Sequence, residues 1–177
     1  MTAQQKTPRP DGIEGHHLEA GKRPWLRPWI APAVLGALLL GALLGLFGGA
    51  PYPTLRDEQQ RAALAMTAPR VLRNGEFFEI KLRVEARGAI AKPRIAVTPA
   101  YWRHLTINTM IPAPSEEGYE DGRFTFAFEP LEAGQSLELK IDGQINPARF
   151  GNSSGAVTLL DDKSVLAELP VHLRVLP

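Results

Sequence analysis

One uncharged apolar stretch near the N-terminus constrains this chain more than any other feature. From Trp29 to Pro53 the sequence contains no Asp, Glu, Lys or Arg, and its centre is rich in Leu, Ala and Gly. About 20 apolar residues in a helix span the roughly 30 Å hydrocarbon core of a bilayer. A backbone in lipid must also satisfy its own hydrogen bonds. We therefore expect residues 29–50 to form a transmembrane helix, with the membrane lipid bilayer as its partner.

The basic residues on the two sides of this stretch predict how it is oriented across the membrane. Lys22, Arg23 and Arg27 precede it, whereas Arg56 and Arg61 follow it among neighbouring carboxylates. Cytoplasmic flanks carry the excess of Lys and Arg. We therefore expect a single-pass protein of a bacterial inner (cytoplasmic) membrane, with a cytoplasmic N-terminus and an extracytoplasmic C-terminal domain. Residues 1–28 are rich in proline and lack apolar periodicity, which predicts a disordered cytoplasmic tail.

A cleaved signal peptide is the alternative to an anchor. It would need a shorter apolar region followed by a small-x-small cleavage site. Gly48-Gly49-Ala50 supplies small residues, but Pro51 follows directly and the charged leader is long. These features favour an uncleaved anchor.

Small residues recur at every fourth position of the apolar stretch. They are Ala33, Ala37, Gly41, Gly45 and Gly49. On one helix they would form a stripe that lets a second backbone approach closely, which predicts helix–helix packing and a homo-oligomer. A segment this rich in Gly and Ala also produces such spacing by chance, and both interpretations stay open.

Beyond the membrane stretch, the apolar period changes to two. Residues 51–66 predict a juxtamembrane linker or short helix, and residues 67–177 predict an extracytoplasmic β-sandwich domain. Phe78, Ile80, Leu82 and Val84 alternate with charged residues, as expected of a half-buried antiparallel strand. Phe124, Phe126 and Phe128 form a second row, which we expect to face the first. Other short alternating runs follow, with no helix pattern between them.

Turn residues separate these runs. Asn74-Gly75 and Asp121-Gly122 precede two of the strands, Asp142-Gly143 is expected to interrupt another, and residues 151–155 are expected to form a loop. Seven or so short strands predict an all-β fold, an immunoglobulin-like antiparallel β-sandwich behind one N-terminal transmembrane helix.

Residues 64–177 resemble the immunoglobulin-like domains of membrane-anchored bacterial envelope proteins. The likeness rests on the Asn74-Gly75 turn, the long strand after it, the aromatic strand, Leu131-x-x-Gly134 and the ending Leu173-x-Val175-x-Pro177. The Cys…Trp…Cys core of true immunoglobulin domains is missing. The resemblance implies a domain that binds or spaces other proteins, although fold alone does not define function.

Few residues suggest chemistry. The chain has no cysteine, which excludes thiolate catalysis and Cys-ligated metals. His104 and His172 have no nucleophile-elbow serine near them in the sequence, the His16-His17 pair lacks further ligands at helical spacing, and no Gly-rich phosphate loop follows a strand. A net charge of +1 gives no field that would attract nucleic acid. We expect no catalytic, cofactor-binding or metal-binding residues and no nucleic-acid partner.

Two short segments are candidates for contact with a partner. Tyr101-Trp102-Arg103-His104 combines residue types that anchor protein interfaces, although the position of Trp102 favours a place in the sandwich core. The segment Ile111-Pro112-Ala113-Pro114 would suit an extended recognition edge, or it stiffens a loop.

Together these features predict a non-enzymatic, membrane-anchored binding or accessory subunit. Its partner would be another envelope or membrane protein. The alternative is a structural or assembly protein that self-associates through its transmembrane helix, and a metal carrier or enzyme is a more distant one.

Overall fold

The computed structural model describes residues 11, 28–49, 51–146 and 150–177. The chain divides into two compact units, Met1–Leu40 and Gly41–Pro177. Nearly all of the predicted cytoplasmic tail, including His16 and His17, lies outside the described residues.

Helix α2 (Ile30–Leu43) forms within the predicted transmembrane segment. Gly45 follows it with φ of 73°, the left-handed conformation that ends many helices. The Gly45 N–H donates to the Ala42 carbonyl and the Leu46 N–H to the Gly41 carbonyl, both at 3.0 Å, which is the hydrogen-bond pattern of a Schellman motif. At 1.5 Å per residue α2 is about 21 Å long. Within the described part of the chain, no helix combines the length and the apolarity needed to cross a membrane.

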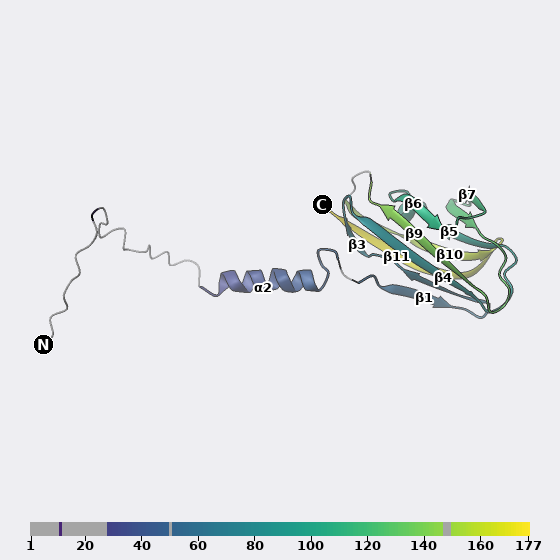
Figure 1. The fold of residues 1–177 in the computed structure, drawn as a ribbon, viewed down its shortest axis with the longest axis horizontal. Coiled ribbons are helices and arrows are strands. Elements are labelled where there is room, and N and C mark those ends of the chain that lie inside the picture. The colour runs from purple at the N-terminus through teal and green to yellow at the C-terminus, as the bar shows by residue number, and fades with distance from the viewer. Residues whose placement is uncertain (1–10, 12–27, 50, 147–149) are drawn as a thin grey trace. The chain divides into compact units, whose positions relative to one another are not determined.

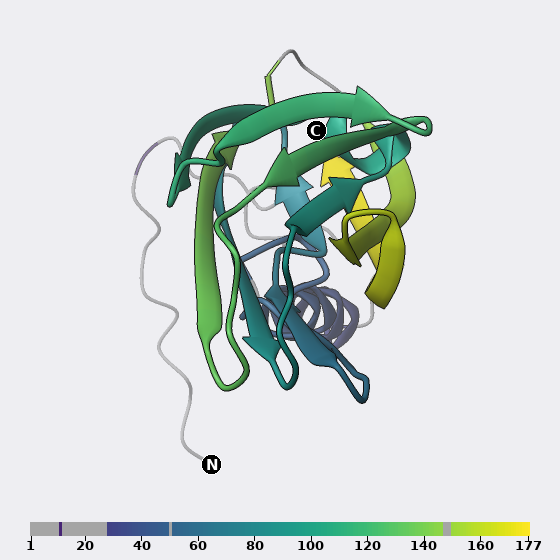
Figure 2. The ribbon, with the colours of Figure 1, turned by 90° about the vertical axis from the view of Figure 1, so that its right-hand side faces the viewer.

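Eleven strands of the described residues form two packed sheets (Figures 1 and 2). Sheet A has the order β1 (Thr54–Glu58), β2 (Ala62–Thr67), β4 (Phe77–Ala86), β9 (Ser136–Gln144) and β6 (Thr106–Ile111). Sheet B has the order β3 (Val71–Arg73), β11 (Ser164–Leu176), β10 (Gly151–Asp161), β5 (Pro93–Val97), β8 (Arg123–Ala127) and β7 (Glu116–Glu120). Among the strands that the structure describes, only the pairing of β3 with β11 is parallel. The predicted all-β sandwich is confirmed.

The core lies between the two sheets, where the apolar rows predicted from the sequence meet. Phe78, Ile80, Leu82 and Val84 of β4 are all buried in sheet A. Phe126 of β8 is buried in sheet B, within the same cluster. Phe124 is partly buried and packs against that cluster. The prediction that these rows face each other is therefore confirmed.

The sandwich begins earlier in the chain than expected. Residues 51–66 were predicted to form a linker or a short helix, but most of them form β1 and β2. Strand β2 pairs with β4 in a register that places Leu64 opposite Val84, and Leu64 is fully buried. Burial against the central strand therefore outweighs the helix propensity of this Ala-rich segment.

Two segments that the sequence predicts to be a loop or a strand interruption lie within continuous strands. Residues 151–155 begin β10 and pair with residues 171–175 of β11. Gly143 lies within β9, where a Cβ atom would meet the Phe78 ring and the Thr106 carbonyl. The glycine is there because neighbouring groups approach the backbone closely, and not because the chain turns.

A short helix, α3 (Pro99–Trp102), packs on β10 of sheet B and also contacts β11 and β8. Gly155 of β10 allows this packing, because a Cβ atom there would collide with the Thr98 hydroxyl and the Cβ atom of Tyr101. The Thr98 hydroxyl also accepts a hydrogen bond from the Ala156 N–H at 3.0 Å.

The outer edge of β11 is closed along most of its length. The Glu168 N–H donates to the Asp57 carboxylate at 2.9 Å, and the Arg174 N–H donates to the Arg70 carbonyl at 2.8 Å. Pro170, between them, has no N–H to offer. This edge therefore has few donors left for an added strand.

One ion pair links the turn between β1 and β2 to the end of β10. The Arg61 guanidinium lies 2.9 Å from the Asp161 carboxylate, whose side chain is mostly buried. The Lys92 N–H donates to the same carboxylate at 3.0 Å. The Lys92 N–H and Arg61 hold the pKa of Asp161 below its ordinary value. This carboxylate joins sheet A to sheet B.

Replacing Gly155 with Ala should destabilise the sandwich by about 2–4 kcal/mol, because the methyl group displaces Thr98 and Tyr101. Urea unfolding followed by circular dichroism would measure the loss. Gly88→Ala is the matched control, since a Cβ atom there meets nothing within 4 Å. Equal stability of the two variants would contradict the role assigned to Gly155.

Replacing Asp161 with Asn should lower the free energy of unfolding at pH 7 by about 1–2 kcal/mol. Because the native pKa of Asp161 is depressed, its stabilisation is present above the unfolded pKa of about 3.9 and disappears as the pH falls through the native value. The wild type and the variant should therefore converge in acid. Urea titrations from pH 3 to 7 would test this, with Asp162→Asn, whose side chain is exposed, as a near-neutral control.

Candidate functional site

The aromatic residues of the segment 101–104 belong to the core. Tyr101 is 2% exposed and Trp102 is 9% exposed. The Trp102 ring packs edge-on against Phe126, with centroids 5.4 Å apart. Burial also raises the pKa of the Tyr101 phenol. The expected partner surface is corrected accordingly: only Arg103 and part of His104 are open to solvent.

The five small residues of the apolar stretch do not share one helix. Ala33, Ala37 and Gly41 lie in α2, whereas Gly45 and Gly49 come after its end and have φ of 73° and 76°. The side chains of Leu46 and Phe47 also cover Gly41, at 3.4 and 3.3 Å from an added Cβ atom. The stripe expected from the sequence is therefore limited to Ala33 and Ala37 on the open helix surface.

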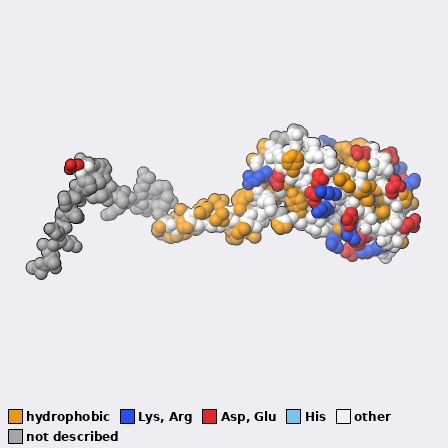
Figure 3. All heavy atoms as spheres, in the orientation of Figure 1, with side chains coloured by type: hydrophobic (Ala, Val, Ile, Leu, Met, Phe, Trp, Pro, Cys, Tyr) orange, Lys and Arg blue, Asp and Glu red, His pale blue; other side chains and the backbone are white. Residues whose placement is uncertain are grey.

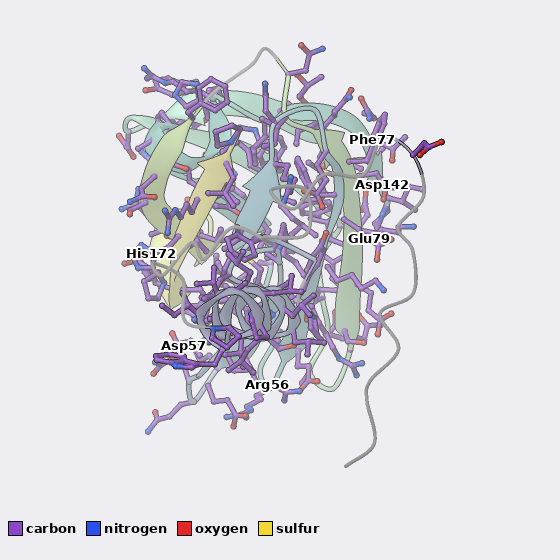
Figure 4. All side chains as sticks on the ribbon, turned by 90° about the vertical axis from the view of Figure 1, so that its left-hand side faces the viewer. Arg56, Asp57, Phe77, Glu79, Asp142 and His172 are labelled. Carbon is purple, nitrogen blue, oxygen red and sulfur yellow. The ribbon has the colours of Figure 1, made fainter. Side chains whose placement is uncertain are left out.

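One serine–histidine contact lies on the outer face of sheet B. The His172 Nδ1 atom is 2.9 Å from the Ser154 hydroxyl, and both residues are exposed on paired strands. No carboxylate among the described residues contacts this histidine. Figure 4 shows His172 on the opposite side of the sandwich from Glu79 and Asp142. The described residues also contain no group of three or more His, Asp or Glu side chains placed to hold a metal ion.

A groove of about 500 Å³ lies on the outer face of sheet A. A volume in this range is typical of ligand sites. Two rows of paired residues cross the strands there. The first runs Thr54, Thr67, Lys81, Lys140 and Ile111, and the second runs Arg56, Ala65, Arg83 and Glu138. We call this surface the sheet A groove.

Small side chains on β2 make the groove deep. Ala65 lies between the longer side chains of Arg56 on β1 and Arg83 on β4, and Thr67 lies beside Lys81 of β4, so the surface is lower at β2. The Thr67 hydroxyl is held 2.7 Å from the Thr54 hydroxyl. At the far end, Ile111 and Pro112 form an apolar rim, and Ile111 is 59% exposed.

Four basic side chains and one carboxylate line the groove. Glu79, just outside it, lies 2.9 Å from Lys81 and 2.7 Å from Lys140. Hydrogen bonds from Lys140 and Lys81 hold the pKa of Glu79 below its ordinary value, and the same contact with Glu79 raises the pKa of Lys140. Lys81 and Lys140 therefore share one carboxylate, that of Glu79.

The two arginines of the groove differ. Arg83 contacts both Glu85 and Glu138 at 2.9 Å. Arg56 lies on the edge strand β1, and no carboxylate of the described residues is within ion-pair distance of it. Figure 4 shows Arg56 at the lower side of the domain, apart from Glu79 and Asp142. Arg56 is thus the cation of the groove that is open to a new anion.

The amino-acid sequence alone does not reveal this groove. Its lysines and arginines look like the ordinary solvent side of an amphipathic strand, and Arg56 was assigned to a linker. The depth arises from the register that places Ala65 beside Arg83, which only the paired strands reveal. The segment Ile111-Pro112 was the one part of the rim that the sequence had marked.

Comparison with known proteins gives only distant likenesses. No protein-family model matches the chain, and no curated protein matches it. Among solved structures, a CARDB domain from Pyrococcus furiosus in complex with di-metal ions shares 11% identity, with a TM-score of 0.44 over 69% of this chain and 93% of that chain. The bacterial hydrophobin BslA shares 15% identity, with a TM-score of 0.42 over 68% of this chain and 99% of that one. The sulfur carrier protein SoxY from Chlorobium limicola shares 15% identity, with a TM-score of 0.38 over 80% and 99% of the two chains. Likenesses at this level do not extend to what the chain binds.

Proposed function

We propose that this chain is a non-enzymatic, membrane-anchored binding or accessory subunit that presents its sandwich outside the cytoplasm. The observation that carries the proposal is the surface of α2, which consists only of apolar residues on every side. Figure 3 shows this helix without a blue or red side chain. Leu35 and Leu39 are 58% exposed and Leu43 is 84% exposed. A helix that is apolar all round requires burial in a core or in lipid.

The apolar residues on both sides of α2 complete the anchor in this proposal. Trp29 precedes the helix, and Leu44–Phe47 follow it as turns. The helix alone, at about 21 Å, is shorter than the roughly 30 Å hydrocarbon core. A short apolar segment is accommodated by local thinning of the bilayer, and interfacial aromatic residues such as Trp29 suit its ends.

The sandwich supplies the binding part of the proposal. Its outer faces carry mixed charges, as Figure 3 shows for one side, and sheet A carries the groove lined by Arg56 and Ile111. A tethered domain with such a groove suits the binding of another envelope or membrane protein. The basic residues before α2 favour a cytoplasmic N-terminus and place the groove on the other side of a bacterial inner membrane.

The anchor can be tested by replacing Leu38 and Leu39 with Arg. Wild-type protein expressed in a bacterial host should sediment with membranes and resist alkaline extraction. Each Arg at a helix centre costs about 2.5–3.5 kcal/mol of insertion, so the double variant should move to the soluble fraction. Replacing the same residues with Phe is the matched control and should leave the protein in the membrane. Intact wild-type protein in the soluble fraction would contradict the proposal.

The orientation of the chain in the membrane and its accessory role need separate measurements. Protease added to spheroplasts should digest the C-terminal domain and spare an N-terminal tag. Crosslinking in intact cells, followed by detergent extraction, should yield a stoichiometric complex with one other membrane or envelope protein. Recovery of the chain as a monomer alone would contradict the accessory role and leave the anchor standing.

A further inference from the structure

We propose that the sheet A groove binds an extended acidic segment of a partner protein, with a carboxylate at Arg56 and an apolar side chain at Ile111. This inference rests on the proposed function for the location of the partner. The recognition itself depends only on the side chains that line the groove.

The length of the groove indicates an extended peptide. Arg56 lies on β1 and Ile111 on β6, at opposite edges of the five-stranded sheet. Four strand spacings of about 4.8 Å separate these edges, which makes about 19 Å. An extended chain advances about 3.3 Å per residue, so about six residues cross the sheet. The open shape suits a chain that enters at one edge and leaves at the other.

The charge of the groove selects acidic segments. Arg56, Lys81, Arg83 and Lys140 face a single lining carboxylate, Glu138. Lys81 and Lys140 share Glu79, and Arg83 is held between two glutamates, so these three cations already have carboxylate partners. Arg56 is the position where a carboxylate would gain an ion pair. A guanidinium holds a carboxylate through two parallel hydrogen bonds.

The opposite end of the groove supplies an apolar contact. Ile111 and Pro112 project at the rim, and Ile111 is an exposed apolar side chain at the end of a strand row. Ala65 and Thr67 leave room in the floor between the two ends. A segment with an acidic residue and an aliphatic residue about five positions apart would fill both ends at once.

The same features do not suit a nucleic acid. Binding to a phosphate backbone depends on several cations that neutralise successive phosphates. Three of the four cations here already contact carboxylates, which leaves Arg56 alone for that role. A peptide needs only one such cation when its other contacts are apolar or neutral.

Selection from a random hexapeptide display library tests the proposal. The target is the purified full-length protein, held in lipid nanodiscs if it fractionates with membranes and free in buffer if it is soluble. Binders to the wild type should carry Asp or Glu near one end and Leu, Ile, Val or Phe near the other. Synthetic peptides of the selected sequences should bind Arg56→Glu at least tenfold more weakly. Selection on Arg56→Glu should replace the acidic preference with a basic one, and selection on Ile111→Ser should lose the apolar preference.

Arg103→Glu is the matched control, since Arg103 is an exposed arginine outside the groove. It should leave both the selected sequences and their affinities unchanged. Circular dichroism should show that every variant keeps the β signal of the wild type. The proposal is overturned if no acidic preference emerges, if Arg56→Glu retains it, or if Arg103→Glu removes it.

Failure of the groove and failure of the anchor give different results. A protein that sediments with membranes but selects no acidic peptides loses this inference and keeps the proposed function. A protein that is soluble in cells but selects acidic peptides loses the anchor and keeps the groove.

Discussion

The burial of the inner face of β4 is the constraint on which the rest of the sandwich depends. Phe78, Ile80, Leu82 and Val84 point into the core from the middle of sheet A, and each fully buried side chain of this kind contributes about 1.5–3 kcal/mol. Strands β2 and β9 take their registers from β4. A slip by one residue would turn these side chains to solvent. The same register sets Lys81 and Arg83 on the outer face, so the groove is a direct result of how the core is packed.

The strands that alternate clearly could be predicted from the sequence, because their outward residues are charged and their inward residues apolar. Phe78–Val84 is the best example, and in Phe124–Phe128 the alternating residues are the smaller Thr125 and Ala127. The strands at residues 62–67 and 151–155 could not be predicted from the sequence, because they depend on pairing with distant segments. The small or polar residues of these segments have little local preference for a strand. The sequence favours the core for Trp102 but does not establish its burial, since that depends on α3 packing over Gly155. The groove could not be predicted for a similar reason. It arises from a difference in side-chain size between neighbouring strands, and which strands are neighbours depends on long-range pairing.

The proposed anchor and the proposed groove rely on opposite physical effects. The anchor depends on the absence of charge along α2, and its chemistry is the same on every side. The groove depends on one arginine without a partner, set among charges that are already paired with one another. An anchor of this kind fixes only where the domain is held, whereas the arrangement around Arg56 and Ile111 would determine which partner it accepts.

The closed edge of β11 matters most for a domain held on a surface. Molecules confined to two dimensions meet one another far more often than molecules in bulk solution, and a bare strand edge then becomes a template on which neighbouring copies grow a shared sheet. The Asp57 carboxylate occupies one donor of that edge, Arg70 another, and Pro170 removes a third. On this side of the sheet, crowded copies would therefore find no regular ladder to extend.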